Sequence, residues 1–276
     1  MSRNFDDFIS IDNVPIMIKS IGNNSYDYNF RNHFECKSVI DSISKPIILR
    51  IGAVMDYVAI EKEVNGMGCK LAMTYEEHKR ASELSNWYPL ISDYTPYSKI
   101  YNEFPAVEEV LNEFSFPIFV KGNRQTNKHN KKLCIIENYD MYNELEKHWK
   151  MDSILHWQDI VIREYIDLQK VDDSSFPDMV PFSYEFRLFF WKKQLISYGP
   201  YWTMGVQYTL DNRDKQKAFS LAQRVAEIID VPFLAVDIAK TKQGKWIVIE
   251  VNDAQESGYV GVNRNELWQN IIAIEK

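Results

Sequence analysis

The sequence predicts a protein of mixed helices and strands, in the α+β (or α/β) class. Short apolar segments with the two-residue alternation of strands recur along the chain, and segments with helical spacing lie between them. The clearest helical segment, 213–230, places aliphatic residues every three or four positions. Strands that alternate with helices in this way indicate sheets packed against helices.

Composition limits the classes of protein to consider. The chain has 276 residues, 45% hydrophobic and 26% charged, as in ordinary soluble enzymes, and this length predicts one large domain or two to three small ones. The net charge of −7 argues against general nucleic-acid binding, and no apolar run approaches the roughly 20 residues of a membrane span. Because the three cysteines lack metal-type spacing and the N-terminal segment lacks the layout of a secretory signal, we expect a cytoplasmic protein.

Three regions are expected: 1–100, 101–160 and 161–276. The first has a strand in "KPIILRIGAV" and a helix in "TYEEHKRASELS", which Thr74 and Glu77 open as a capping box. The second reads as strand, polar loop, strand and helix. Five further strands are predicted near and within the third region, at 159–166, 184–191, 194–199, 232–240 and 245–252.

The last two of these strands form a predicted antiparallel hairpin. In "WIVIEVND", strict alternation would place Trp246, Val248, Glu250 and Asn252 on one face. With a turn centred near 242–243, Asp237 on the first strand would lie opposite Val248 and diagonal to Glu250. Diagonal neighbours are about 7–8 Å apart, within joint reach of one bridging ion.

Asp237, Glu250 and Asn252 would then form an all-oxygen cluster. Hard oxygen ligands with only two carboxylates suit Mg²⁺, whose remaining positions are filled by water and phosphate. The alternative is a pair of strand-end carboxylates and a turn asparagine that are solvated or paired with lysines. The hairpin alone does not decide between the two interpretations.

A second feature is the basic loop 121–132, which follows an apolar strand ending in Lys121. It holds five basic residues, one histidine and no acid, although the whole chain is acidic. A lysine that emerges from a strand is a fixed point charge for phosphate, and the loop beyond it would close over the ligand. The alternative is a solvated hairpin tip or a weak nucleic-acid contact.

Two further apolar strands carry charged residues. Glu164 ends one of them and is followed by Tyr165 and Ile166, a combination that can read a purine edge through one acceptor side chain and an extended backbone. The alternative is an edge-strand glutamate. On the next strand Glu185 and Arg187 share a face, and they either pair with each other or flank a ligand.

The order of these features resembles the ATP-grasp superfamily, between Lys79 and Asn252. Members for comparison are the D-alanine–D-alanine ligases and the ligases that add glutamate to a ribosomal protein, and the basic loop looks more like lesser-known bacterial and phage members. The E-x-N ending, with an aspartate thirteen residues before its glutamate, is the most specific part. The resemblance implies two α+β subdomains that grip ATP, 101–160 and 161–276, after a small α/β N-terminal domain, 1–100.

The resemblance implies a role for each of these residues. Asp237, Glu250 and Asn252 would hold Mg²⁺ at the ATP phosphates. Phosphate contacts would come from Lys79, Lys121, Arg124 and Lys128. Glu164, with the backbone of Tyr165 and Ile166, would hold adenine, and Glu185 the ribose. Arg187 would neutralise the transferred phosphoryl group and act in catalysis with Lys121, because Ala235 stands where related ligases can carry an arginine.

The implied activity is an ATP- and Mg²⁺-dependent ligase that joins a carboxylate to the amine of an amino acid or peptide through an acyl phosphate. An ATP-grasp kinase, a non-catalytic nucleotide-binding protein and a nucleic-acid binder are the alternatives. Neither the substrates nor the oligomeric state follows from the sequence. Candidate substrate-side residues are Arg50, Tyr198, Tyr201 and Trp202, although a strand-end arginine such as Arg50 is more often a member of a surface ion pair.

Overall fold

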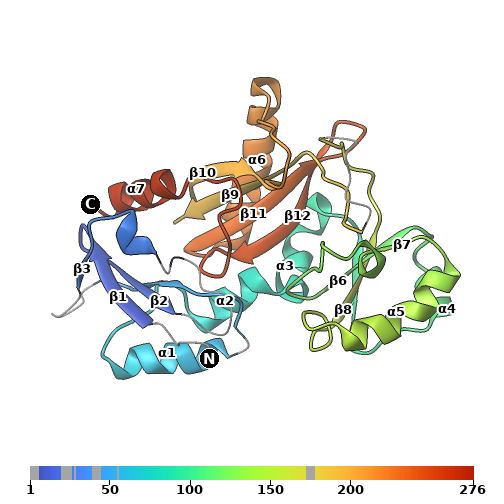
Figure 1. Cartoon of the computed structure of the whole chain (residues 1–276), viewed down its shortest axis with the longest axis horizontal. Helices are drawn as coiled ribbons and strands as arrows, with labels where there is room; N and C mark the ends of the chain where they lie inside the picture. The colour runs from blue at the N-terminus through green and yellow to red at the C-terminus, as the bar shows by residue number, and fades with distance from the viewer. Residues whose placement is uncertain (1–5, 20–26, 28, 39–44, 55, 172–177) are drawn as a thin grey trace.

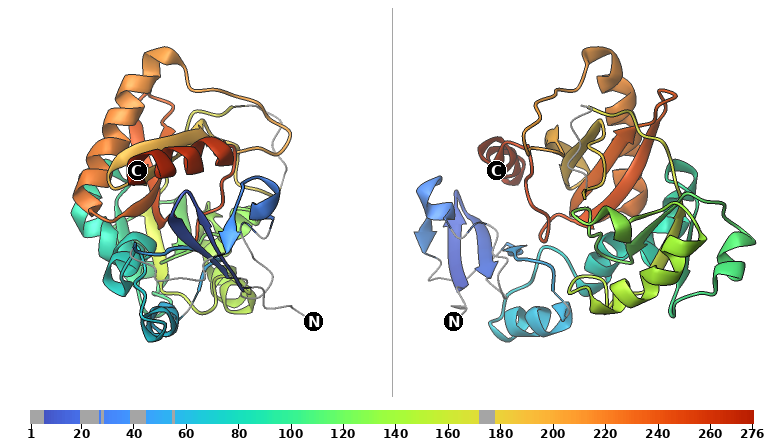
Figure 2. Two further views of the ribbon diagram at one scale, coloured as in Figure 1. Left: turned by 90° about the vertical axis from the view of Figure 1, so that its left-hand side faces the viewer. Right: turned by 45° about the vertical axis from the view of Figure 1, so that its right-hand side comes forward.

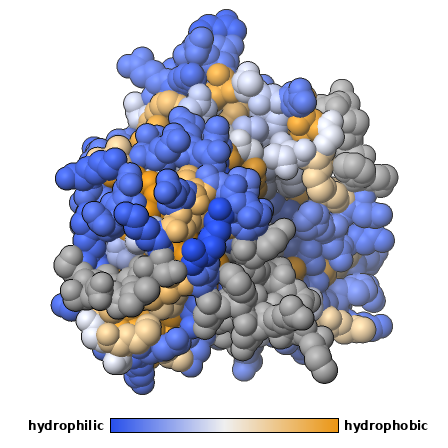
Figure 3. Space-filling model, turned by 60° about the vertical axis from the view of Figure 1, so that its left-hand side comes forward, coloured by the Kyte–Doolittle hydropathy of each residue, from blue (hydrophilic) through white to orange (hydrophobic). Residues whose placement is uncertain are grey.

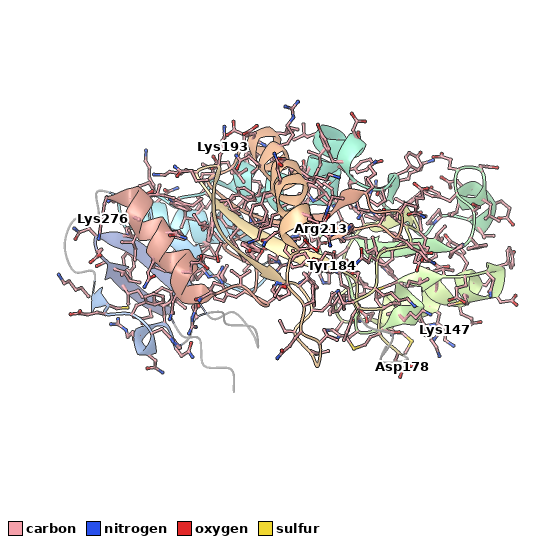
Figure 4. The ribbon with its side chains drawn as sticks, turned by 90° about the horizontal axis from the view of Figure 1, so that it is seen from above. Lys147, Asp178, Tyr184, Lys193, Arg213 and Lys276 are labelled. Atoms are coloured by element: carbon pink, nitrogen blue, oxygen red, sulfur yellow. The ribbon has the colours of Figure 1, made fainter. Side chains whose placement is uncertain are left out.

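The computed structural model describes residues 6–19, 27, 29–38, 45–54, 56–171 and 178–276. Its strands form three four-stranded sheets that follow one another along the long axis of the molecule (Figure 1). Seen from above, Lys276 lies near one end and Lys147, on the helix of the small sheet, near the other, with Tyr184 between them (Figure 4). In the described ranges, no helix combines the length and the apolarity needed to cross a bilayer.

The N-terminal sheet has the order β3-β1-β2-β4, with β2 and β4 parallel. Its helix α1 (Tyr57–Gly66) starts at Asp56, whose side chain accepts from the Ala59 amide, and buries Tyr57, Ile60 and Val64 against this sheet. The strands are β1 (Asp6–Ile11), β2 (Val14–Lys19), β3 (Lys37–Ser38) and β4 (Ile48–Arg50), and a short 3-10 turn η1 (Phe30–Asn32) precedes β3. On the side of this sheet and α7 (Arg264–Glu275), the surface is mostly hydrophilic, with apolar residues in narrow strips (Figure 3).

Two helices connect the N-terminal sheet to the rest of the molecule. The predicted capping box is confirmed at the start of α2 (Tyr75–Ser82): the Thr74 hydroxyl accepts from the Glu77 amide at 3.3 Å, and the Glu77 carboxylate accepts from the Thr74 amide at 2.8 Å. The chain bends at Glu83 and continues as α3 (Leu84–Ile91) and a short 3-10 turn η2 (Ser92–Tyr94). Both α2 and α3 lie against β12 (Trp246–Asp253) of the large sheet (Figure 1).

The small sheet has the order β5-β8-β6-β7 and packs on α4 and α5. The predicted succession of strand, polar loop, strand and helix is confirmed here. The expected boundary at 100 falls inside β5, and the one at 160 falls at the start of β8. Both strands pair within this sheet, so the small sheet extends past each expected boundary. The elements are β5 (Ser98–Tyr101), α4 (Val107–Leu111), β6 (Ile118–Gly122), η3 (Lys131–Leu133), β7 (Ile135–Ile136), α5 (Tyr139–Met151) and β8 (Ile160–Glu164).

The large sheet is antiparallel throughout, with the order β10-β9-β11-β12, and lies beside the small sheet (Figure 2). The four predicted strands of this region are confirmed. Helix α6 buries its alanine- and isoleucine-rich face against β11 and β12, and α7 lies along β10. The elements are β9 (Glu185–Trp191), β10 (Gln194–Pro200), α6 (Asn212–Ile229), β11 (Phe233–Lys240), β12 (Trp246–Asp253) and α7 (Arg264–Glu275).

The register of the β11–β12 hairpin differs from the predicted one. Asp237 lies directly opposite Glu250, whereas Ile238 pairs with Val248, so Ile249 is an extra residue in a β-bulge. The bulge reverses the alternation: Trp246 and Val248 enter the core, while Ile247 and Ile249 line a cavity. The prediction that Trp246 and Val248 share a face with Glu250 is therefore wrong, and the bulge brings the two carboxylates closer than the diagonal arrangement would.

Candidate nucleotide site

An open cavity with about 760 Å³ of free space lies between the small sheet and the large sheet. Apolar side chains of both sheets line it together with charged groups. Mostly apolar walls with a few charged groups are typical of sites that bind small molecules. The apolar lining residues that lie on strands are Phe119, Ile135, Ile247 and Ile249.

The segment expected to bind adenine lies at the rim of this cavity. Glu164, Tyr165 and Ile166 all line it, and the Glu164 side chain is exposed. The Glu164 amide donates to the carbonyl of Tyr97 at 2.9 Å, which fixes the start of the segment. Neither Tyr165 nor Ile166 donates a backbone hydrogen bond to another described residue. Their amides are therefore available to a ligand.

Lys121 and Glu250 form a close buried ion pair between β6 and β12. Burial opposes the charge of Glu250, but Lys121 and Lys128 outweigh it and lower the pKa of the carboxyl to about 2. For Lys121 the balance is reversed: burial lowers its pKa in spite of Glu250. The pair links a strand of the small sheet to a strand of the large sheet, and Glu250 directly follows Ile249, which lines the large cavity.

Lys128, from the basic loop, reaches across to Glu185 on β9, with Nζ 3.0 Å from Oε1. The Ser183 hydroxyl donates to the other oxygen of Glu185 at 3.0 Å, and Nζ of Lys128 lies 3.9 Å from the centre of the Tyr201 ring. Burial raises the pKa of Glu185, whereas the surrounding carboxylates overcome burial and raise the pKa of Lys128. The basic loop is thus tied to the large sheet by one charged contact.

Arg187 pairs with Asp237 and not with Glu185, although the two share a face of β9. Its Nε and Nη2 groups donate to the two oxygens of Asp237 at 2.8 and 2.7 Å, and Nη1 donates to the carbonyl of Gly258 at 2.9 Å. Burial opposes its charge, but Asp237 keeps the pKa of Arg187 raised. Such a two-pronged pair fixes the guanidinium rigidly beside the carboxylates.

Asp237, Glu250 and Asn252 lie on one face of the hairpin, because Asp237 pairs with Glu250 and Asn252 pairs with Ala235, two residues before Asp237. In the described part of the chain, no group of three or more His, Cys, Asp or Glu side chains is arranged to hold a metal. Two carboxylates and one amide are hard oxygen donors, and this set fits Mg²⁺ better than a soft transition metal. These are the residues that could hold the ion.

A second, smaller cavity adjoins Asn252. It is lined by Ala53, Ser82, Arg124, Gln125, Asn252, Asp253, Glu256 and Ser257. Arg124, expected among the phosphate contacts, lies here and donates from Nη2 to Glu256 at 3.0 Å. Behind this wall, His78 Nδ1 lies 2.9 Å from an oxygen of Asp253. Sequence reasoning missed this contact, because 175 positions separate the two residues.

Several predicted residues line neither cavity, among them Lys121, Arg187, Asp237 and Glu250 as well as Lys79 and Arg50. The Nζ atom of Lys79 lies 5.7 Å from the centre of the Tyr75 ring, one turn earlier on α2. Arg50 is fully buried, so both sequence interpretations of it are wrong: it donates to Asp27 at 2.7 Å and to the carbonyls of Gln255 and Ser257 at 3.2 and 3.0 Å. Of the other substrate-side candidates, Trp202 lines the large cavity.

Arg163 is a cavity residue that sequence reasoning missed. It lies beside Glu164 on β8, buried, on the same face as Lys121. A charged residue inside an apolar strand was the available signal, since strand alternation turns Arg163 inward when Glu164 faces outward.

Solved structures share this arrangement of sheets at low sequence identity, which shows a common fold. A RimK domain ATP-grasp protein from Sphaerobacter thermophilus is 14% identical, with a TM-score of 0.56 over 84% of this chain and 82% of that one. D-alanine–D-alanine ligase from Bacillus anthracis, solved with ATP, is 13% identical, with a TM-score of 0.54 over 78% and 68%. An L-amino acid ligase from Bacillus licheniformis is 11% identical, with a TM-score of 0.51 over 75% and 48%.

Comparison with curated proteins finds no match. A family model described as an "ATP-grasp domain" matches residues 108–271, more than half of the chain. The match begins in α4 and extends into α7, so it includes the whole large cavity apart from Pro96. The chain belongs to the ATP-grasp family.

Proposed function

We propose that the protein is an ATP- and Mg²⁺-dependent ligase that joins a carboxylate to an amine through an acyl phosphate. One observation supports this most: a single cavity has the Glu164–Ile166 segment at its rim and the Lys128–Glu185 pair in its wall. The carboxylates of Glu250 and Asp237 lie opposite one another on the neighbouring hairpin. These residues would supply the adenine, phosphate and metal contacts of one nucleotide.

The charged groups of the cavity are arranged to exchange partners when the nucleotide binds. Lys121 and Lys128 now neutralise Glu250 and Glu185. With ATP bound, the two lysines would turn to phosphate oxygens, Glu250 to the metal and Glu185 to the ribose. A buried carboxylate or lysine left without a partner costs several kcal/mol, so each ligand group must replace the contact that it breaks.

Asp237, Glu250 and Asn252 would hold Mg²⁺, which when bound supplies positive charge to the phosphate oxygens. Arg187 stays rigid through its two bonds to Asp237 and would stabilise charge on the transferred phosphoryl group. A carboxylate oxygen of the first substrate attacks the γ-phosphorus, and ADP leaves. The amine then attacks the acyl carbon, inorganic phosphate leaves and the nitrogen loses a proton, which yields the amide.

Water must be kept from the acyl phosphate, and the basic loop is placed to do this. Arg124 and Gln125 donate their amides to the Gln158 side chain at 2.8 Å each, and the Val180 amide donates to the carbonyl of Lys128 at 3.1 Å. These contacts hold the loop over the gap between the two sheets. A closed loop excludes water and commits the substrates to reaction.

The smaller cavity next to Asn252 is where we place the substrates. Arg124 offers a cation for a carboxylate, and Glu256 an anion for an ammonium group, side by side. A molecule that carries both charges close together, such as an amino acid or the end of a peptide, matches this pair. Two of the similar structures are amino acid ligases by name.

A phosphate-release assay with the purified protein, MgATP, and pools of amino acids and short peptides tests this proposal. We expect release of ADP and phosphate in equal amounts only when a carboxylate and an amine are both present, with an amide product in the mass spectrum. Arg187→Met should abolish turnover, and Lys99→Met, which removes an exposed lysine paired with Glu113, should not. A phosphorylated acceptor that forms without an amine would indicate a kinase. ATP binding without any turnover would indicate a nucleotide-binding protein.

A further inference from the structure

Arg163 is the buried cation of the cavity that has no carboxylate partner among the described residues. Lys121, Lys128 and Arg187 each form an ion pair with a carboxylate. Arg163 instead donates from Nε to the Ser98 hydroxyl and from Nη1 to the carbonyl of Ile249, both at 2.8 Å. Its Nη2 group is buried and has no hydrogen-bond partner in the described part of the chain.

Such a group is costly unless something binds to it. Only 4% of Arg163 is exposed, and this burial lowers its pKa to about 10, with Glu250 opposing the shift. A buried N–H group without a partner costs about 1–3 kcal/mol, and more when it is charged. The arginine therefore either clamps β8 to β12 at a cost or holds a place for an anion.

The position of the side chain favours an anion. Arg163 lines the large cavity, directly precedes the Glu164–Ile166 segment, and shares a face of the small sheet with Lys121. It therefore lies between the segment that would hold adenine and the lysine that would hold phosphate.

We propose that Arg163 binds the nucleotide directly, with its Nη2 group donating to an oxygen of the phosphate nearest the ribose. This inference rests on the proposed ATP site, and it adds a contact from β8 to those expected from the lysines. The guanidinium is planar, so the bonds of Nε to Ser98 and of Nη1 to Ile249 fix the direction in which Nη2 points. A donor held in this way binds without losing further conformational freedom.

The experiment is a calorimetric titration of adenosine, AMP and ADP, without metal, into wild type and into Arg163→Met and Arg163→Lys. For Arg163→Met we expect the Kd of AMP and of ADP to rise by about tenfold or more, because a charge-assisted hydrogen bond is lost. The Kd of adenosine, which has no phosphate, should change by less than about twofold. Arg163→Lys should recover part of the loss.

Arg80→Met is the matched control. It also removes one arginine whose bonds go to backbone carbonyls, those of Ile229 and Asp230, away from the cavity. Its nucleotide affinities should equal those of wild type. Circular dichroism establishes that each variant is folded. If Arg163→Met does not fold, Arg163→Lys is compared with wild type instead. The proposal then requires that the Kd of AMP divided by the Kd of adenosine be higher for Arg163→Lys than for wild type.

If the Kd of adenosine and the Kd of AMP rise equally in the Arg163 variants, the inference is overturned, because the arginine would then only hold the cavity wall. Unchanged affinities for both would overturn it as well. In either case the wild type still binds nucleotide, so the proposed function stands. A wild type that binds no adenine nucleotide at all would contradict the proposed function together with this inference.

Discussion

Buried charges of opposite sign, paired one to one, set the chemistry of this cavity at the scale of single residues. The partners come from different sheets or from distant strands: 129 positions separate Lys121 from Glu250, and 57 separate Lys128 from Glu185. Lys121, Glu185 and Glu250 can be found in the sequence as charges within or at the end of apolar segments, and Lys128 as part of the basic loop. Their pairing cannot, because it depends on how the two sheets meet.

Glu250 should make the stability of the protein depend on pH in the acidic range. Its folded-state pKa of about 2 lies below the ordinary value of 4.5, so the carboxylate contributes stability above about pH 4.5 and loses it as the pH falls toward 2. The shift corresponds to roughly 3 kcal/mol. Urea denaturation of wild type and Glu250→Gln at pH 6, 4 and 3 measures this.

The variant should lose less stability than wild type across this range. Glu146→Gln serves as the control, because Glu146 pairs with Lys150 on the exposed surface of α5 and should leave the pH profile unchanged. Parallel profiles for wild type and Glu250→Gln would contradict the assignment of the acid sensitivity to this carboxylate.

At the scale of elements, local sequence signals were sufficient to predict the helices. They were insufficient to predict the register of the β11–β12 hairpin. The capping box of α2 and the apolar face of α6 depend on neighbours within a few positions, and both are confirmed. The bulge at Ile249 depends on how β12 meets both β11 and the cavity, and nothing in "WIVIEVND" marks it. Strict alternation therefore assigned Trp246 and Val248 to the wrong face.

The basic loop provides a prediction for an element. Gln158→Ala removes the side-chain oxygen that accepts from the amides of Arg124 and Gln125. Without it, this part of the loop should open more often, and trypsin should cut after Arg124 and Lys128 several times faster than in wild type. Gel analysis of timed digests measures the rate, and MgATP should slow it in both proteins.

Equal cleavage rates with and without MgATP would contradict the role of the loop as a lid. Gln169→Ala is a matched control, because the hydrogen bonds of Gln169 with Lys240 and Tyr184 use its backbone and not its side chain. Its digestion pattern should match that of wild type.

At the scale of the whole molecule, the N-terminal sheet is joined to the segment that follows β12. Arg50 on β4 donates to backbone carbonyls of this segment, and the Gln255 side chain accepts from the amide of Leu49 at 3.1 Å. The position of Asn252 thus depends on residues about two hundred positions away. This dependence explains why Arg50, a strand-end arginine in sequence, is part of the core.

Arg50→Met should destabilise the entire chain. It leaves the fully buried carboxylate of Asp27 without its main cation, which costs about 3–5 kcal/mol. Urea unfolding followed by tryptophan fluorescence should show an earlier midpoint and still a single transition. Arg31→Met removes an arginine paired with Asp7 on the exposed surface of the same domain and should cost about 1 kcal/mol or less. Similar losses for the two variants would contradict the proposed connection between the sheets.

The proposed function requires ATP and Mg²⁺ to bind together, at the large cavity and the β11–β12 hairpin beside it. Calorimetric titration of ATP, with and without Mg²⁺, into wild type and Glu250→Ala tests this most directly. We predict that wild type binds ATP more tightly with Mg²⁺ and that the variant, if folded by circular dichroism, loses this gain, because one of the two metal-facing carboxylates is gone. ATP binding that is equal with and without Mg²⁺ in wild type, or a magnesium effect that persists in Glu250→Ala, would contradict it.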